Sequence, residues 1–187
     1  ILYNMKSRLR EIFKLKREYF KPSLSDLNNI NQNLQSLIAF LNFEYVMSFS
    51  PLPREVDIKD TNNWILNSKE LYLPKVKQEA LDVFKIENLE KDLEKGSFKI
   101  LEPKDSCFQS SRGAINVIIV PGVCFDENGY RLGFGRGYYD KFLDGFLGAK
   151  IGVCFEEFLT SDIYPEKHDI QMDFVVTEKA IYAQKKN

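Results

Sequence analysis

The sequence predicts an α/β domain in which a mostly parallel central sheet lies between helices, with two further helices at the start of the chain. Two observations predict it: strand-like apolar runs alternate with helical segments, and residues 115–120 form a β-branched run without polar alternation. Such a run suits a strand covered on both faces, as at the centre of an α/β sheet. The length of 187 residues suits one domain, so we expect residues 1–187 to form a single one.

The first two helices are expected at residues 5–19 and 27–41. In both segments apolar residues recur at the spacing of a helix with one buried face. Pro22 separates the two segments, and Ser23 or Ser25 can cap the second helix.

The later elements are expected to alternate in type. Strands are predicted at residues 45–49, 70–73, 80–86, 115–120, 150–155 and 173–177. Helices are predicted at residues 57–66, 89–95 and 138–146. We expect Pro74 to end the strand before it and Gly96 to end the short helix before it.

The composition excludes several classes of protein. With 26 basic and 27 acidic residues the formal net charge is -1, which gives no general attraction to nucleic acid or to an acidic membrane. No apolar run reaches the roughly 20 residues that cross a bilayer. Three cysteines without CxxC spacing favour neither a disulfide framework nor a structural zinc site. We expect a cytoplasmic monomer that binds neither nucleic acid nor membrane.

The segment most informative about function is residues 131–140, with the sequence RLGFGRGYYD. Its three glycines allow positive φ angles and close approach of a ligand to the backbone. Successive backbone N–H groups and the start of the following helix form an anion site. Arg131 and Arg136 can bind phosphate oxygens, and Asp140, in the helix that follows, is a suitable magnesium ligand.

The spacing matches neither of the common nucleotide-binding loops. There is no GxxxxGK[ST] sequence, and Tyr138 stands where a dinucleotide fingerprint needs its third glycine. On spacing alone, a tight structural turn and a phosphate-binding loop both remain open.

The glycine-rich segment, together with VPGVCFD before it, resembles the signature of the 5-formyltetrahydrofolate cyclo-ligase family. Further matches cover nearly the whole chain. They are the Lys6–Arg10 pair, Glu55–Val56, Leu73–Pro74, Glu102–Pro103, and His168–Asp169 with Asp173.

This resemblance implies conversion of 5-formyltetrahydrofolate to 5,10-methenyltetrahydrofolate with ATP and Mg²⁺, and release of ADP and phosphate. The residues implied for ATP are Lys6, Arg10, Arg131, Leu132, Gly133, Phe134, Gly135, Arg136, Gly137, Tyr138 and Tyr139. Those implied for the folate are Ser50, Glu55, Gly133, Phe134, Gly135, Arg136, Gly137 and Tyr138. Those implied for the metal are Asp140 and Asp173.

Each candidate also has a purely structural interpretation. Lys6 and Arg10 can belong to a solvated helix face, and Glu55 can cap the next helix. Asp126 can make an Asx turn, Tyr138 and Tyr139 can be packing residues, and His168 can be a hydrogen-bonded structural residue.

Two other functions remain open at this stage. Arginines and aromatic residues mixed in a glycine-rich loop can stack on single-stranded RNA. A sugar-phosphate isomerase or a CoA-transferase-like protein would have a similar fold, and fold alone does not decide function.

Overall fold

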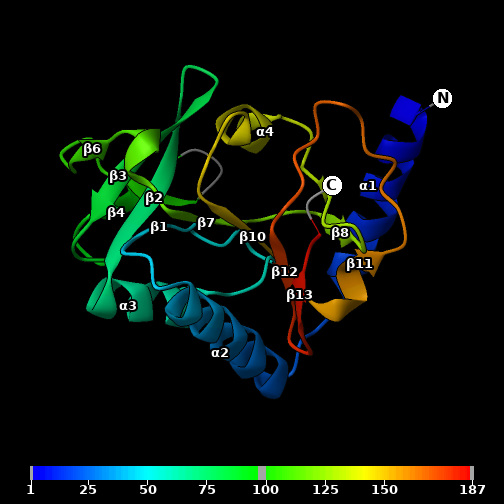
Figure 1. Cartoon of the computed structure of the whole chain (residues 1–187), viewed down its shortest axis with the longest axis horizontal. Helices are drawn as coiled ribbons and strands as arrows, with labels where there is room; N and C mark the ends of the chain where they lie inside the picture. Colours follow the sequence, from blue (N-terminus) through cyan, green and yellow to red (C-terminus); the bar gives the residue numbers. More distant parts are fainter. Residues whose placement is uncertain (1, 97–99, 186–187) are drawn as a thin grey trace.

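The computed structural model describes residues 2–96 and 100–185, and it confirms the expected α/β fold (Figure 1). The helices are α1 (Leu2–Tyr19), α2 (Leu24–Leu41), α3 (Lys59–Ser68) and α4 (Tyr138–Leu143), with 3-10 turns η2 (Arg112–Ala114) and η3 (Glu156–Phe158). The first strands are β1 (Tyr45–Met47), β2 (Glu70–Lys77), β3 (Ala80–Ile86), β4 (Leu93–Lys95), β5 (Leu101–Pro103) and β6 (Gln109–Ser110). The later strands are β7 (Val117–Val120), β8 (Cys124–Asp126), β9 (Arg131–Leu132), β10 (Ala149–Val153), β11 (Leu159–Thr160), β12 (Phe174–Val176) and β13 (Ile181–Ala183).

The central sheet has eight strands in the order β13-β12-β10-β7-β1-β2-β3-β6. Its middle, from β12 to β2, is parallel, whereas β13, β3 and β6 add to the two sides in antiparallel pairs. Every residue of β7 is fully buried, which confirms the prediction for the β-branched run. Parallel strands present their carboxyl ends at one edge of the sheet, and ligands usually bind there in folds of this kind.

Helices cover both faces of this sheet. In Figure 1, α2 and α3 lie on one side and α4 lies on the other. The buried side chain of Asn31 joins α2 to α3, because its amide oxygen accepts bonds from the backbone N–H and the hydroxyl of Thr61. A capping box formed by Ser23 and Asp26 begins α2, which confirms Ser23 as the cap from the two predicted candidates, Ser23 and Ser25.

Helix α1 packs on a second, three-stranded sheet with the order β11-β8-β9 (Figure 1). Aromatic rings contact the turn η3 just before β11: Phe13 of α1 and Phe20, just after α1, meet Phe158 with ring centroids 6.2 and 5.2 Å apart. Phe20 also meets Phe155 at 5.1 Å. The first helix is therefore part of the same hydrophobic core as the central sheet.

The prediction of a helix at residues 89–95 is wrong. The chain there forms a turn followed by the short strand β4. The side chain of Asn88 accepts bonds from the backbone N–H groups of Glu90 and Lys91, and Asp92 accepts bonds from those of Glu87 and Asn88. These local side-chain bonds compete with helical hydrogen bonds and favour the turn.

Most predicted boundaries differ from the structure by a few residues, and two of these differences have a clear physical reason. Strand β2 continues through Pro74 to Lys77 because β1 pairs with it only as far as Tyr72, so that the missing N–H of proline breaks no bond on that side. Helix α4 ends at Leu143, three residues early, and Gly145 with φ 69° turns the chain toward β10. No helix in residues 2–96 and 100–185 has the length and hydropathy needed to span a membrane.

Gly152 of β10 allows β8 to cross closely over the sheet. A Cβ atom at this position would lie 2.3 Å from the ring of Phe125, which is fully buried. We expect Gly152→Ala to lower the free energy of unfolding by about 1–3 kcal/mol, measured by urea denaturation. Gly113→Ala is the control, because the nearest atom to its added Cβ is 3.9 Å away. Equal stability of the two variants would contradict this account of the packing.

Candidate active site

Helix α1 and several loops meet at the carboxyl edge of the central sheet. The turn at residues 121–123 directly follows β7, and Arg17 of α1 donates hydrogen bonds to the carbonyl oxygens of Gly122 and Val123. Arg10, two turns earlier in α1, donates from Nε to the carbonyl oxygen of Gly133 at 2.9 Å. The first helix thus binds the backbone on both sides of the β8–β9 hairpin.

The glycine-rich loop leaves β9 and enters α4. Gly135 and Gly137 have φ angles of 105° and 68°, which only glycine adopts readily, and Gly137 is the N-cap of α4. The side chain of Phe134 is 39% exposed, and the ring lies 5.6 Å from the guanidinium carbon of Arg17. Arg136 is exposed, and Leu132 is buried within β9.

Arg131 lies beneath this loop rather than at its surface. Its side chain is 5% exposed and forms an ion pair with Asp140 at 2.5 Å. It also donates a bond to the carbonyl oxygen of Pro121 at 3.3 Å and lies against the ring of Tyr139 at 5.5 Å. Its guanidinium therefore holds Asp140, in the first turn of α4, against the turn that ends β7.

Lys6 of α1 forms ion pairs with the segment that contains the His168–Asp169 motif. Its ammonium group is 2.5 Å from the carboxylate of Asp169 and 3.1 Å from that of Glu166, and its side chain is 8% exposed. His168 between these partners is 70% exposed, so its neighbour Asp169, and not the histidine, makes the buried contact. The Lys6–Asp169 pair joins the first helix to the C-terminal motif, a contact that is not predicted from the sequence.

The two predicted metal ligands have different partners. Asp173 accepts bonds from the backbone N–H of Lys150 at 2.8 Å and from its ammonium group at 3.0 Å. Lys150 pairs with Ile118, three residues before Pro121, or about 10 Å away along the strands. In the described parts of the chain, no three His, Cys, Asp or Glu side chains form a group that could hold a metal ion. Asp140 lies beside the glycine-rich loop, whereas Asp173 lies at the amino end of β10.

Glu55 lies in the loop after β1, at the same edge of the sheet. Its carboxylate accepts a bond from the N–H of Leu52 at 2.8 Å, so it points back into its own loop and does not cap α3. Burial raises the pKa of Glu55, while the bond from Leu52 and the positive charge of Arg17 act in the opposite direction. Ser50, in the same loop, is half-buried.

The structure adds Arg17, which the sequence-based prediction did not include. Burial lowers the pKa of its guanidinium, and the charge of Glu55 raises it. The spacing contained a signal: Lys6, Arg10 and Arg17 are four and seven residues apart and so share one face of α1. A basic helix face can be buried when backbone carbonyls bind its guanidinium groups.

Asp126 makes the predicted Asx turn. One carboxylate oxygen accepts bonds from the N–H groups of Asn128 and Tyr130, and the other accepts one from Ile163 at 3.4 Å. Its role is to shape the β8–β9 hairpin that carries Arg131.

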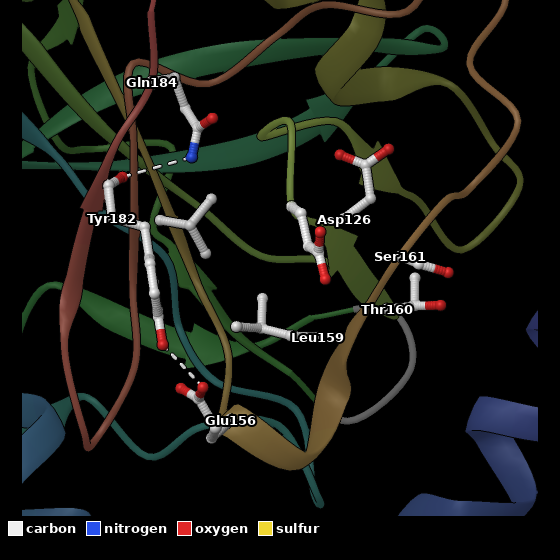
Figure 2. A pocket seen from close by; sticks show the side chains of 9 residues that line it. Asp126, Glu156, Leu159, Thr160, Ser161, Tyr182 and Gln184 are labelled. Carbon is white, nitrogen blue, oxygen red and sulfur yellow. Dashed lines mark hydrogen bonds between the residues drawn. The ribbon is translucent and has the colours of Figure 1, made fainter.

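A separate cavity of about 320 Å³ lies between β8, β11, β12 and β13 (Figure 2). The carboxylate of Glu156 in this cavity accepts bonds from the hydroxyl groups of Tyr182 at 2.6 Å and Thr177 at 2.7 Å. The bond to Glu156 raises the pKa of Tyr182 to about 12. Asp126 and Glu127 also line the cavity, and three carboxylates disfavour a polyphosphate.

Comparison with known proteins shows the family to which the chain is similar. Residues 3–178 match the model of the 5-formyltetrahydrofolate cyclo-ligase family. The solved 5,10-methenyltetrahydrofolate synthetase of Aquifex aeolicus is 32% identical, with a TM-score of 0.87 over 98% of this chain and 94% of that one. The 5-formyltetrahydrofolate cyclo-ligase of Saccharomyces cerevisiae is 29% identical over 81% of this chain and 84% of the yeast protein. That of Mus musculus is 26% identical over 93% of this chain and 90% of the mouse protein.

The fold and the site at the carboxyl edge of the sheet define an α/β enzyme with a glycine-rich loop. The chain belongs to the 5-formyltetrahydrofolate cyclo-ligase family. The solved synthetase of Mycoplasma pneumoniae, 23% identical with a TM-score of 0.72, shows the same fold.

We expect the charge of Arg17 to affect the pKa of Glu55, and this effect can be measured. The positive charge lowers the pKa of the half-buried carboxyl, so Arg17→Gln should raise the pKa of Glu55 further and move its protonation to higher pH. Carbon-13 NMR of the glutamate side-chain carboxyls measures this midpoint. Lys14→Gln, an exposed change on the same helix, is the control and should leave the midpoint unchanged. An unmoved Glu55 midpoint in Arg17→Gln would show that the two charges do not interact.

Proposed function

We propose that this enzyme converts 5-formyltetrahydrofolate to 5,10-methenyltetrahydrofolate with ATP and Mg²⁺, releasing ADP and phosphate. The observation that carries the proposal is the bond from Arg10 to Gly133, which joins the basic face of α1 to a glycine-rich loop beside Glu55. The loop offers backbone N–H groups and positive φ glycines for phosphates, and Glu55 offers a carboxylate for the N–H groups of a pterin ring.

The reaction requires activation of a formamide, which is a poor electrophile. The formyl oxygen attacks the γ-phosphorus of ATP, so that an O–P bond forms and ADP leaves. N10 of the folate then attacks the formyl carbon and loses its proton to solvent, the ring closes, and the carbon–oxygen bond breaks to release phosphate. Phosphoryl transfer requires mainly positioning and neutralisation of charge, so no side-chain nucleophile is needed.

The site divides into an ATP side and a folate side in this proposal. Arg10 neutralises phosphate charge from α1, and Lys6 does so once it exchanges its contact with Glu166 for one with a phosphate. The glycine-rich loop, from Arg131 to Tyr139, holds the phosphates with its backbone. Arg131 acts indirectly, because it is buried and holds Asp140. Glu55 binds the pterin, Ser50 lies on the same side, and Phe134 and Tyr138 contact the folate.

Asp140 fits a magnesium ion better than Asp173 does. The side chain of Asp140 is 30% exposed beside the phosphate loop, and its bond to Arg131 fixes its orientation. Asp173 is 15% exposed and already neutralised by Lys150. A bound magnesium ion would neutralise charge on the ATP phosphates, and we propose Asp140 as its protein ligand, because Asp173 lies at the amino end of β10, away from the glycine-rich loop.

The proposed function is tested by adding 5-formyltetrahydrofolate, ATP and Mg²⁺ to the purified protein. Near-ultraviolet absorbance follows methenyltetrahydrofolate, and ADP is assayed in the same sample. Both products should appear together, and neither without Mg²⁺. A folded protein that forms neither would refute the proposal. Salt-dependent RNA binding without ADP release would instead favour an RNA-binding module.

Asp140→Asn should lose magnesium-dependent turnover by about a hundredfold or more while the protein stays folded. Asparagine keeps an oxygen that accepts the bond from Arg131 but loses the charge that holds the metal. Turnover is measured against Mg²⁺ concentration, and circular dichroism checks the fold. Asp144→Asn, at the other end of α4, is the matched control. Rates like those of the unmodified protein would exclude Asp140 as a metal ligand.

Lys6→Ala should raise the KM for ATP about tenfold, and raise it more than the KM for the folate, because a cation on the phosphate side is lost. Lys14→Ala, an exposed lysine of the same helix, provides the control. If both KM values rise equally, Lys6 acts by holding the turn at Asp169 and not by binding ATP.

A further inference from the structure

A second cavity, of about 300 Å³, lies between α4 and the antiparallel strands β3 and β6. Residues from three segments line it: Ala80, Leu81, Asp82, Val83, Ser110, Arg112, Tyr138, Lys141 and Phe142. Tyr138 is the residue at which the glycine-rich loop becomes helix α4, so the cavity begins where the proposed folate site ends.

The charges of this cavity are opposite to those of the acidic cavity in Figure 2. Lys141 and Arg112 carry positive charge, and Asp82 is the one acidic residue among those that line it. Lys141 stands three residues after Tyr138, which places both side chains on the same face of α4. An anionic ligand is therefore favoured here, and it would lie next to Tyr138.

Arg112 is fixed in place. Its Nη1 atom donates bonds to the carbonyl oxygens of Phe142 at 3.0 Å and Asp144 at 2.6 Å, at the carboxyl end of α4. A guanidinium group has five N–H donors, so these two bonds leave further donors for a carboxylate. A positive group held in this way loses little side-chain entropy when it binds a ligand.

We propose that the cavity between α4 and β3 binds the carboxylates of the folate's glutamate tail, with Lys141 and Arg112 as their partners. This inference rests on the proposed function. A folate has its pterin at one end and its glutamate carboxylates at the other, so a pterin near Glu55 sends the tail past Tyr138. Each additional γ-linked glutamate adds one carboxylate, and the exposed positions of Lys141 and Arg112 let a longer tail continue into solvent.

The first test compares 5-formyltetrahydrofolate carrying one and three glutamates as substrates. The triglutamate should have the lower KM in the unmodified protein, and Lys141→Gln should reduce this preference by about twofold to fivefold, as expected for an exposed ion pair. The KM for ATP should not change. Asp82→Asn should have the opposite effect and strengthen the preference, because it removes a repelling charge. Lys95→Gln, in β4, is the control and should change nothing.

The second test does not depend on turnover. The probe is p-aminobenzoyl-triglutamate, which has the tail but no pterin, added to nitrogen-15-labelled protein. Backbone amide signals of Val83, Tyr138 and Lys141 should shift, and the shifts should decrease in Lys141→Gln and at high salt.

The outcomes separate this inference from the proposed function. Absence of turnover with the monoglutamate refutes the proposed function, whereas the probe still reports on the cavity. Normal turnover with a tail-length preference that is the same in Lys141→Gln, Asp82→Asn and the unmodified protein would overturn the tail site alone. Absence of probe-induced shifts at Val83, Tyr138 and Lys141 would also overturn it.

Discussion

The bonds from arginines of α1 to backbone carbonyls are the interaction on which the candidate site depends. Arg10 binds Gly133, and Arg17 binds Gly122 and Val123, so one helix fixes both ends of the β8–β9 hairpin. These loop carbonyls have no partner in the central sheet, and buried backbone groups require one. The guanidinium groups satisfy them and bring positive charge to the carboxyl edge of the sheet. One set of contacts thus serves both stability and ligand binding.

Much of the fold followed from the sequence because the strongest patterns were local. Residues within each segment determine its structure in three cases: the apolar run of β7, the helical spacing of α2 and the cap at Ser23. The helix predicted at residues 89–95 failed because Asn88 and Asp92 bind nearby N–H groups. Pro74 predicts a strand end from local sequence alone, whereas the extent of β1 decides whether a proline is tolerated there.

The candidate site was predicted less completely, since its geometry depends on contacts between distant segments. The family resemblance implies that both the glycine-rich loop and α1 bind ATP. The bond from Arg10 to Gly133 joins these two segments. It could not indicate that Arg131 lies beneath the loop and pairs with Asp140, or that Arg17 is near Glu55. Burial of an arginine depends on which carbonyls and carboxylates surround it, and no spacing along one segment contains that information.

The ion pair between Lys6 and Asp169 joins residues 163 positions apart. During synthesis α1 is made before its partners at Gly122, Gly133 and Asp169, which lie 105 to 163 residues further along the chain. Contacts of such long sequence separation close slowly, because the loop between them must first be ordered. The basic, amphipathic α1 therefore cannot pack until these later segments have been translated. During that time chaperones or other nascent chains can bind its exposed aromatic side chains.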